Sequence, residues 1–84
     1  MVIQVGKEPD PAKRIRVSQG KRLRRVRKLR QISAHDFAAK LKVTDGAVYQ
    51  WETGRHTPRQ SLQVQIAQIL DVPWSSIFGL DEAA

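Results

Sequence analysis

The sequence contains no cysteine, and its 84 residues include only two tryptophans, one tyrosine and two phenylalanines. The lack of cysteine excludes a disulfide framework and a thiolate zinc site. Uninterrupted apolar runs are about three residues long, against the roughly 20 needed to span a bilayer. The first ten residues, MVIQVGKEPD, contain no apolar core of a signal peptide. We therefore expect a cytoplasmic protein that does not interact with membranes.

The chain is also short, which limits what it is able to do. A sequence of 84 residues closes about one small hydrophobic core, so we expect a single domain. It leaves little room for a scaffold and a deep substrate cleft, and we expect neither enzymatic activity nor a cofactor. His35 and His56 are the only histidines, and without cysteines or carboxylate sets they do not predict a metal site.

Acidic residues are scarce in the first half of the chain. Residues 1–42 hold 13 lysines and arginines against three acids, and residues 43–84 hold two against five. From Lys13 to Arg30 there are ten basic residues and no acid. These positive charges repel one another unless a negatively charged molecule lies beside them, which favours a polyanionic partner. The alternative is an ordinary solvated helix face.

The apolar residues recur at helical spacing along most of the chain. Residues 1–17 contain Gly6, Pro9 and Pro11, which do not sustain a helix, and we interpret them as a flexible basic arm. Beyond them the pattern predicts an all-α domain over 18–80, followed by a short tail at 81–84. We expect a compact bundle of about five short helices over about 18–30, 34–42, 45–53, 61–70 and 74–80.

Capping residues mark the second and third of these helices. Ser33 precedes one helix, with Asp36 in the capping-box position, and Thr44 precedes the next after a very tight turn. Gly54 is placed to end the third helix in a left-handed conformation. Two short helices joined by a three- or four-residue turn are the arrangement that places one helix in the major groove of DNA.

At this point the chain resembles the helix-turn-helix DNA-binding domains of λ repressor and Cro type, the XRE family. The resemblance runs from about Gly20 to Phe78 and rests on the joint spacing of several motifs. These are GKRLRRVRKLRQIS, FAAKLKVTDGAVYQWETG, Pro58, IAQILDV and the closing IF. It implies an ion pair between Arg27 and Glu52 that has a structural role.

The resemblance also implies which residues contact bases, with a recognition helix at about 45–53. The residues are Thr44, Asp45, Gly46, Ala47, Tyr49 and Gln50. Gln50 is the strongest candidate for a base contact, because its amide both donates to and accepts from adenine. The alternative is that Gln50 is an ordinary exposed helix residue that contacts no base. Asp45 either accepts from cytosine N4 or simply interacts with the helix dipole.

Phosphate contacts are expected around the start of the second helix and the loop after the third. The residues are Ser33, Ala34, Lys40, Lys42, Arg55, His56 and Arg59. Related domains often have glutamine at the position of Ala34. Because this chain lacks that glutamine, its basic residues must supply a larger share of the phosphate contacts. Gln31 and Lys42 stand where relatives usually have glycine, and we expect both to be left-handed.

Three further features are left with alternatives. Lys13, Arg14 and Arg16 are expected to form an arm that follows the DNA backbone or enters the minor groove. Alternatively, the basic excess is explained by the helical stripe of Arg22, Arg24, Arg25 and Lys28, which would face an acidic protein partner. Gln63 interrupts an apolar stripe, and either bonds a loop carbonyl or contacts a second subunit.

A dimer would place two recognition helices one DNA turn apart. The expected dimer surface is Trp74, Phe78 and Leu80. The alternative is that these residues cover the core of their own subunit.

These expectations together favour a sequence-specific DNA-binding repressor that occupies a palindromic operator as a homodimer. One alternative is an antitoxin, which pairs a domain of this kind with a toxin protein. Another is a non-specific binder of nucleic acid or of anionic membrane that uses charge alone.

Overall fold

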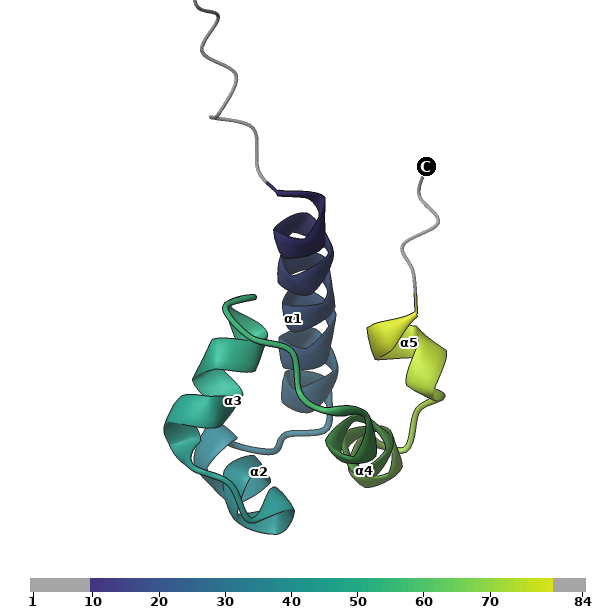
Figure 1. Cartoon of the computed structure of the whole chain (residues 1–84). Helices are drawn as coiled ribbons and strands as arrows, with labels where there is room; N and C mark the ends of the chain where they lie inside the picture. Colours follow the sequence, from purple (N-terminus) through teal and green to yellow (C-terminus); the bar gives the residue numbers. More distant parts are fainter. Residues whose placement is uncertain (1–9, 80–84) are drawn as a thin grey trace, which may run out of the picture.

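The computed structural model describes residues 10–79, which form five helices and contain no strand. In Figure 1 the long helix α1 stands in the middle, with α2 and α3 on one side of it and α4 and α5 on the other. The all-α bundle expected from the sequence is therefore confirmed. The helices are α1 (Pro11–Leu29), α2 (Ala34–Leu41), α3 (Asp45–Glu52), α4 (Gln60–Leu70) and α5 (Trp74–Phe78).

Helix α1 begins at Pro11, so the predicted start at Ser18 is wrong. The Asp10 carboxylate caps the helix by accepting from the backbone N–H of Ala12 at 3.2 Å. Proline is favourable at the first helical position, because its fixed φ suits the helix and its missing N–H has no partner there. Residues 11–17 are thus two helical turns, whereas residues 1–9 of the predicted arm and residues 80–84 lie outside the described residues.

The turn between α2 and α3 follows the predicted capping chemistry. The Ser33 hydroxyl accepts from the Asp36 N–H at 3.0 Å, and the Thr44 hydroxyl accepts from the Ala47 N–H at 3.1 Å. Lys42 ends α2 in the left-handed region with φ of 60°. Each cap satisfies a backbone donor that the first helical turn leaves free. This fixes where α3 begins relative to α2.

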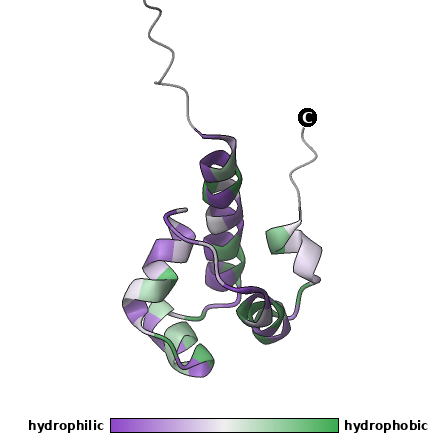
Figure 2. Ribbon diagram, viewed as in Figure 1, coloured by the Kyte–Doolittle hydropathy of each residue, from purple (hydrophilic) through white to green (hydrophobic). Residues whose placement is uncertain are grey.

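The core lies where all five helices meet. Leu23, Phe37, Val48, Ile66 and Ile77 are at most 1% exposed, and each comes from a different helix. Figure 2 shows hydrophobic and hydrophilic residues alternating along α1, as expected for a helix with one buried stripe. Because α1 and α2 pack against its buried face, α3 is held from one side while its other face stays exposed.

Two glycines allow α1 to approach the end of α3 closely. A Cβ at Gly20 would lie 2.6 Å from the carbonyl oxygen of Glu52 and even closer to that of Trp51. Gly54 has φ of 79°, and a Cβ there would lie 2.6 Å from the Val17 side chain. Gly54 therefore ends α3 in the predicted left-handed conformation. The backbone of α1 thus supports the C-terminal end of α3.

Arginines of α1 bind backbone carbonyls near the ends of other helices. Arg16 Nε donates to the Gly54 carbonyl at 3.1 Å, and Arg22 Nη2 donates to that of Gly79 at 3.0 Å. Arg30 donates to the carbonyls of Leu70 and Asp71 at 2.8 and 3.1 Å. The basic character of α1 is therefore partly a requirement of the fold.

Gln63 joins the loop before α4 to the start of α5. Its Nε2 donates to the Pro58 carbonyl at 2.8 Å, and its Oε1 accepts from the indole Nε1 of Trp74 at the same distance. The predicted bond to a loop carbonyl is confirmed. A polar residue is tolerated at the edge of this apolar stripe because both ends of its amide are satisfied.

Candidate nucleic-acid interface

The outward face of α3 carries most of the residues expected to contact bases. Asp45, Gly46, Tyr49 and Gln50 are exposed, and they recur at the spacing of one helix face. Thr44, also exposed, precedes them as the N-cap. Ala47 is half-buried and packs against the core, and Val48 and Trp51 are buried. The structure thus gathers five of the six residues on one surface beginning at the N-terminus of α3.

Gln50 sits where α3 meets the following loop. Its carbonyl accepts from the N–H groups of Arg55 and His56 at 2.9 and 3.3 Å, which fixes the loop against the helix. Within residues 10–79 the Gln50 side-chain amide makes no hydrogen bond. Its donor and acceptor are therefore both available to a base edge.

Tyr49 and Arg55 lie together on this surface. The guanidinium carbon of Arg55 is 5.9 Å from the centroid of the Tyr49 ring, within the range of a cation–π contact. The tyrosine remains 58% exposed. Arg55, which we expect to contact a DNA phosphate, is thus held beside Tyr49, which we expect to contact bases.

His35 and Asp45 form an exposed ion pair between α2 and α3. The His35 Nδ1 is 3.2 and 3.1 Å from the two carboxylate oxygens of Asp45. This hydrogen bond, together with the charges of Asp45 and Asp36, raises the pKa of His35. The sequence did not indicate a role for His35, since ten residues separate it from Asp45 and only the packing of two helices joins them.

Arg27 and Glu52 form the ion pair that the family resemblance implies. Arg27 Nε and Nη2 donate to the two carboxylate oxygens of Glu52 at 2.7 and 3.1 Å, and Nη1 donates to the Ile32 carbonyl at 2.8 Å. The two side chains are 8% and 9% exposed. The pair therefore joins α1 to the end of α3 and leaves Arg27 no surface to offer DNA.

The residues expected at phosphates surround α3 without forming one cluster. Lys40, Lys42, Arg55, His56 and Arg59 are exposed. Arg59 precedes α4 and its Nε donates to the Ser61 hydroxyl at 3.2 Å. At the start of α2, the Ser33 hydroxyl is occupied by the Asp36 N–H and Ala34 is half-buried, so both offer mainly their backbone.

The predicted roles of the basic residues near the N-terminus need correction. Lys13 and Arg14 are exposed on the first turns of α1 rather than on an arm. Arg16 is half-buried and bonds Gly54, and Arg22 is half-buried and bonds Gly79. Arg24 was assigned to the same stripe as Arg22, but it borders a surface pocket with Asp45 and Tyr49. The stripe is therefore not one surface.

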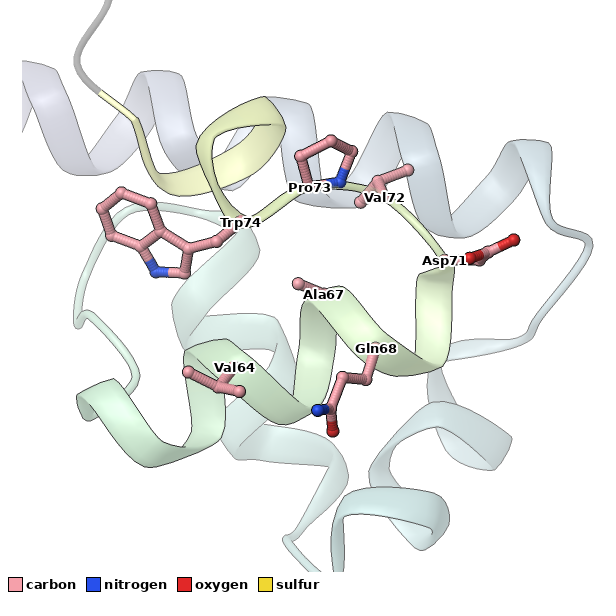
Figure 3. Close-up of a pocket in the computed structure, with 7 residues that line it drawn as sticks. All are labelled: Val64, Ala67, Gln68, Asp71, Val72, Pro73 and Trp74. Atoms are coloured by element: carbon pink, nitrogen blue, oxygen red, sulfur yellow. The ribbon is translucent and has the colours of Figure 1, made fainter.

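A groove lies on the opposite side of the bundle, between α4 and the segment that leads into α5 (Figure 3). It has a volume of about 440 Å³ and is lined by Val64, Ala67, Gln68, Asp71, Val72, Pro73 and Trp74. Val64 and Trp74 are 45% and 43% exposed. Phe78, expected at a dimer surface, is only 4% exposed and belongs to the core, because α5 packs it inward with Ile77. Leu80 lies outside the described residues.

Residues 10–79 contain no group of three or more histidine, aspartate or glutamate side chains placed to hold a metal ion. None of the five helices combines the length and apolar character that a membrane span requires.

Comparison with known proteins agrees with this architecture. A family model described as helix-turn-helix matches residues 23–77, well over half of the chain. A search of curated proteins finds no match. The matched region covers both helices of the motif, the Arg27–Glu52 pair and the groove at α4. The chain therefore belongs to the λ repressor-type (XRE) helix-turn-helix family of DNA-binding regulators.

Proposed function

We propose that this protein is a repressor that acts on DNA in the cytoplasm by occupying a specific operator. The observation that supports this most strongly is the exposed face of α3, where Gln50 presents an unoccupied amide on a helix held rigidly from behind. A bidentate amide of this kind favours adenine in the major groove. The mechanism requires binding alone, without chemistry on the DNA.

Specificity and affinity come from different residues in this proposal. Asp45 and Glu52 are the only charged residues of α3, and Glu52 is paired internally with Arg27. Base contacts therefore rest largely on neutral groups. The exposed cations around α3, namely Lys40, Lys42, Arg55 and Arg59, bind phosphates and provide affinity that depends on salt.

A single α3 covers only about half of a typical operator, so we propose that two copies bind together. The groove beside Trp74 and Val64 supplies the apolar contact between the copies. Both side chains are partly exposed in a protein whose other large apolar residues are mostly buried. Phe78 supports this surface from within the core rather than taking part in it.

Selection of bound sequences from random duplex DNA tests the proposal. We expect the protein to enrich a motif with two related half-sites about 10 base pairs apart, centre to centre. Binding to the winning duplex should weaken steeply as salt is raised. Enrichment of no motif would refute the repressor, and enrichment of a single half-site would refute the dimer.

A second candidate function is supported by the exposed cations on α1. Arg14, Lys21 and Arg25 border a shallow pocket with Val17 and Ser18, on a surface separate from that of α3. Such a surface suits an acidic protein partner, as an antitoxin would require. Co-expression with neighbouring genes tests this, since a partner should copurify and be released by charge reversal at Lys21 and Arg25.

A further inference from the structure

The His35–Asp45 pair stands where the two helices of the motif both begin. His35 is the second residue of α2 and Asp45 is the first residue of α3. Their side chains are 79% and 63% exposed, so the pair contributes little to the core. It nevertheless holds both carboxylate oxygens of Asp45 near one ring nitrogen, at 3.1 and 3.2 Å. The hydrogen bond orients the carboxylate between the first turns of α2 and α3.

The paired carboxylate still has acceptor capacity for a ligand. An ionised carboxylate offers about four lone-pair sites, and one imidazole nitrogen occupies only part of them. In the major groove, cytosine N4 and adenine N6 are amino donors, whereas guanine and thymine present carbonyl oxygens that a carboxylate repels. A fixed Asp45 carboxylate therefore discriminates between amino and carbonyl base edges.

The second ring nitrogen of His35 changes its character with protonation. When Nδ1 carries the hydrogen toward Asp45, Nε2 of the neutral ring is an acceptor, and in the imidazolium it is a donor. Protonation also changes the pair from a net charge of −1 to zero. Both changes favour a neighbouring phosphate at the N-terminus of α2.

We propose that His35 is a positioning residue, which orients Asp45 toward the amino group of a cytosine or adenine and, when protonated, adds a phosphate contact through Nε2. This inference rests on the proposed DNA-binding function and deepens it. It assigns base discrimination to the orientation of Asp45 and assigns a pH-dependent part of the affinity to the ring of His35.

The charged groups around His35 determine the direction of the pH effect. Asp45 from α3 raises its pKa through the hydrogen bond and its charge, and Asp36 from α2 adds a smaller effect in the same direction. Arg24 from α1 borders a pocket with Asp45 rather than His35. His35 thus stays protonated to a higher pH than an ordinary histidine. Phosphates favour the protonated ring further, so affinity must fall as pH rises through its pKa.

DNA binding by matched variants tests the proposal, in a His56→Gln background because His56 is the other histidine. We expect affinity for the selected duplex to fall by about three- to tenfold between about pH 6 and pH 8. A change of this size corresponds to a His35 pKa that differs by up to about one unit between the free and the DNA-bound protein. The preference for an amino base at the Asp45 position should change little over this range, because the neutral ring still donates from Nδ1.

Three substitutions separate the two roles. His35→Gln keeps a donor for Asp45 without titrating, so it should retain the base preference and lose the pH dependence. His35→Ala should lose both, and Asp45→Ala, which removes the acceptor altogether, should lose the preference for an amino base. If His35→Ala binds with the wild-type preference and the wild-type pH profile, His35 has no such role. Circular dichroism confirms that each variant is folded.

A titration without DNA separates failure of this inference from failure of the proposed function. NMR should show that Asp45→Ala lowers the pKa of His35, because it removes both the hydrogen-bond acceptor of the ring and the charge beside it. If the pKa of His35 is unchanged and the wild type still enriches a motif, the proposed role of the His35–Asp45 pair is refuted, whereas the proposed repressor function is not. If the wild type enriches no motif, both proposals fall.

Discussion

Gln50 and Arg55 are neighbours on the proposed interface, yet we expect their removal to have different effects. Gln50→Ala removes a base contact, so it should cost about 1–3 kcal/mol at one base pair and relax the preference there. Arg55→Ala removes a phosphate contact, so it should weaken all duplexes alike and reduce the salt slope by about one. Dissociation constants on the selected site and its single-base-pair variants distinguish the two.

Arg55→Lys is the matched control for the second substitution. It keeps the charge at the phosphate but loses the planar group beside Tyr49, so it should retain most of the affinity. Equal losses on operator and random DNA after Gln50→Ala would remove Gln50 from base recognition.

The Arg27–Glu52 pair predicts a large effect on stability. Arg27→Ala leaves Glu52 about nine-tenths buried without its partner and the Ile32 carbonyl without its donor, so it should cost about 3–5 kcal/mol. The double variant Arg27→Met, Glu52→Leu removes both charges and should recover much of this loss. Urea unfolding monitored by circular dichroism measures both. A loss below about 1 kcal/mol in Arg27→Ala would show that the pair is unimportant.

At the scale of elements, Gly20 of α1 and Gly46 of α3 predict opposite changes. Gly20→Ala places a methyl group against the backbone carbonyls that end α3, which is expected to cost about 1–3 kcal/mol of stability. Gly46→Ala meets only the Thr44 hydroxyl at 3.8 Å, so it should stabilise α3 by about 0.5–1 kcal/mol. Thermal unfolding measures both changes.

The same two variants should differ again in DNA binding. Gly46 lies on the exposed face, so its new methyl group is expected to reduce affinity even though the fold is more stable. Retention of full stability by Gly20→Ala would mean that α1 and α3 separate easily, contrary to the close contact described above.

Most element boundaries could be predicted from the sequence because local chemistry sets them. Ser33 and Thr44 cap their helices, and Gln31 and Lys42 adopt the predicted left-handed conformation with φ of 59° and 60°. The start of α1 was missed because Pro11 was interpreted as a helix breaker. Proline has that effect within a helix, but at the first position after a capping aspartate it favours the helix.

The surface of α3 was also predictable, whereas the contacts that cross between elements were not. Helical periodicity alone separates Tyr49 and Gln50 from the buried Val48 and Trp51. The His35–Asp45 pair depends on how α2 and α3 cross, which spacing in the sequence does not give. The burial of Phe78 likewise depends on how a five-residue helix turns against α1.

For the whole molecule, the distribution of exposed cations predicts a directional salt effect. Lys40 and Lys42 lie on the motif, whereas Lys21 and Arg25 lie on the surface of α1. Lys40→Gln with Lys42→Gln should reduce the slope of log affinity against log salt by up to about two, because about 0.9 is lost per phosphate contact. The matched double variant Lys21→Gln, Arg25→Gln should leave that slope nearly unchanged. Equal reductions in both would indicate non-specific attraction to the whole basic surface.

The contacts of α1 also determine when the fold becomes complete during translation. Gln19 and Arg22 donate to the carbonyls of Phe78 and Gly79, which lie 59 and 57 residues later in the chain. Helix α1 is therefore synthesised before these partners exist, and its basic side chains meanwhile remain open to other anions, including ribosomal RNA. Only when residue 79 has emerged do the Gln19 amide and the Arg22 Nη2 have these carbonyls as acceptors within the protein.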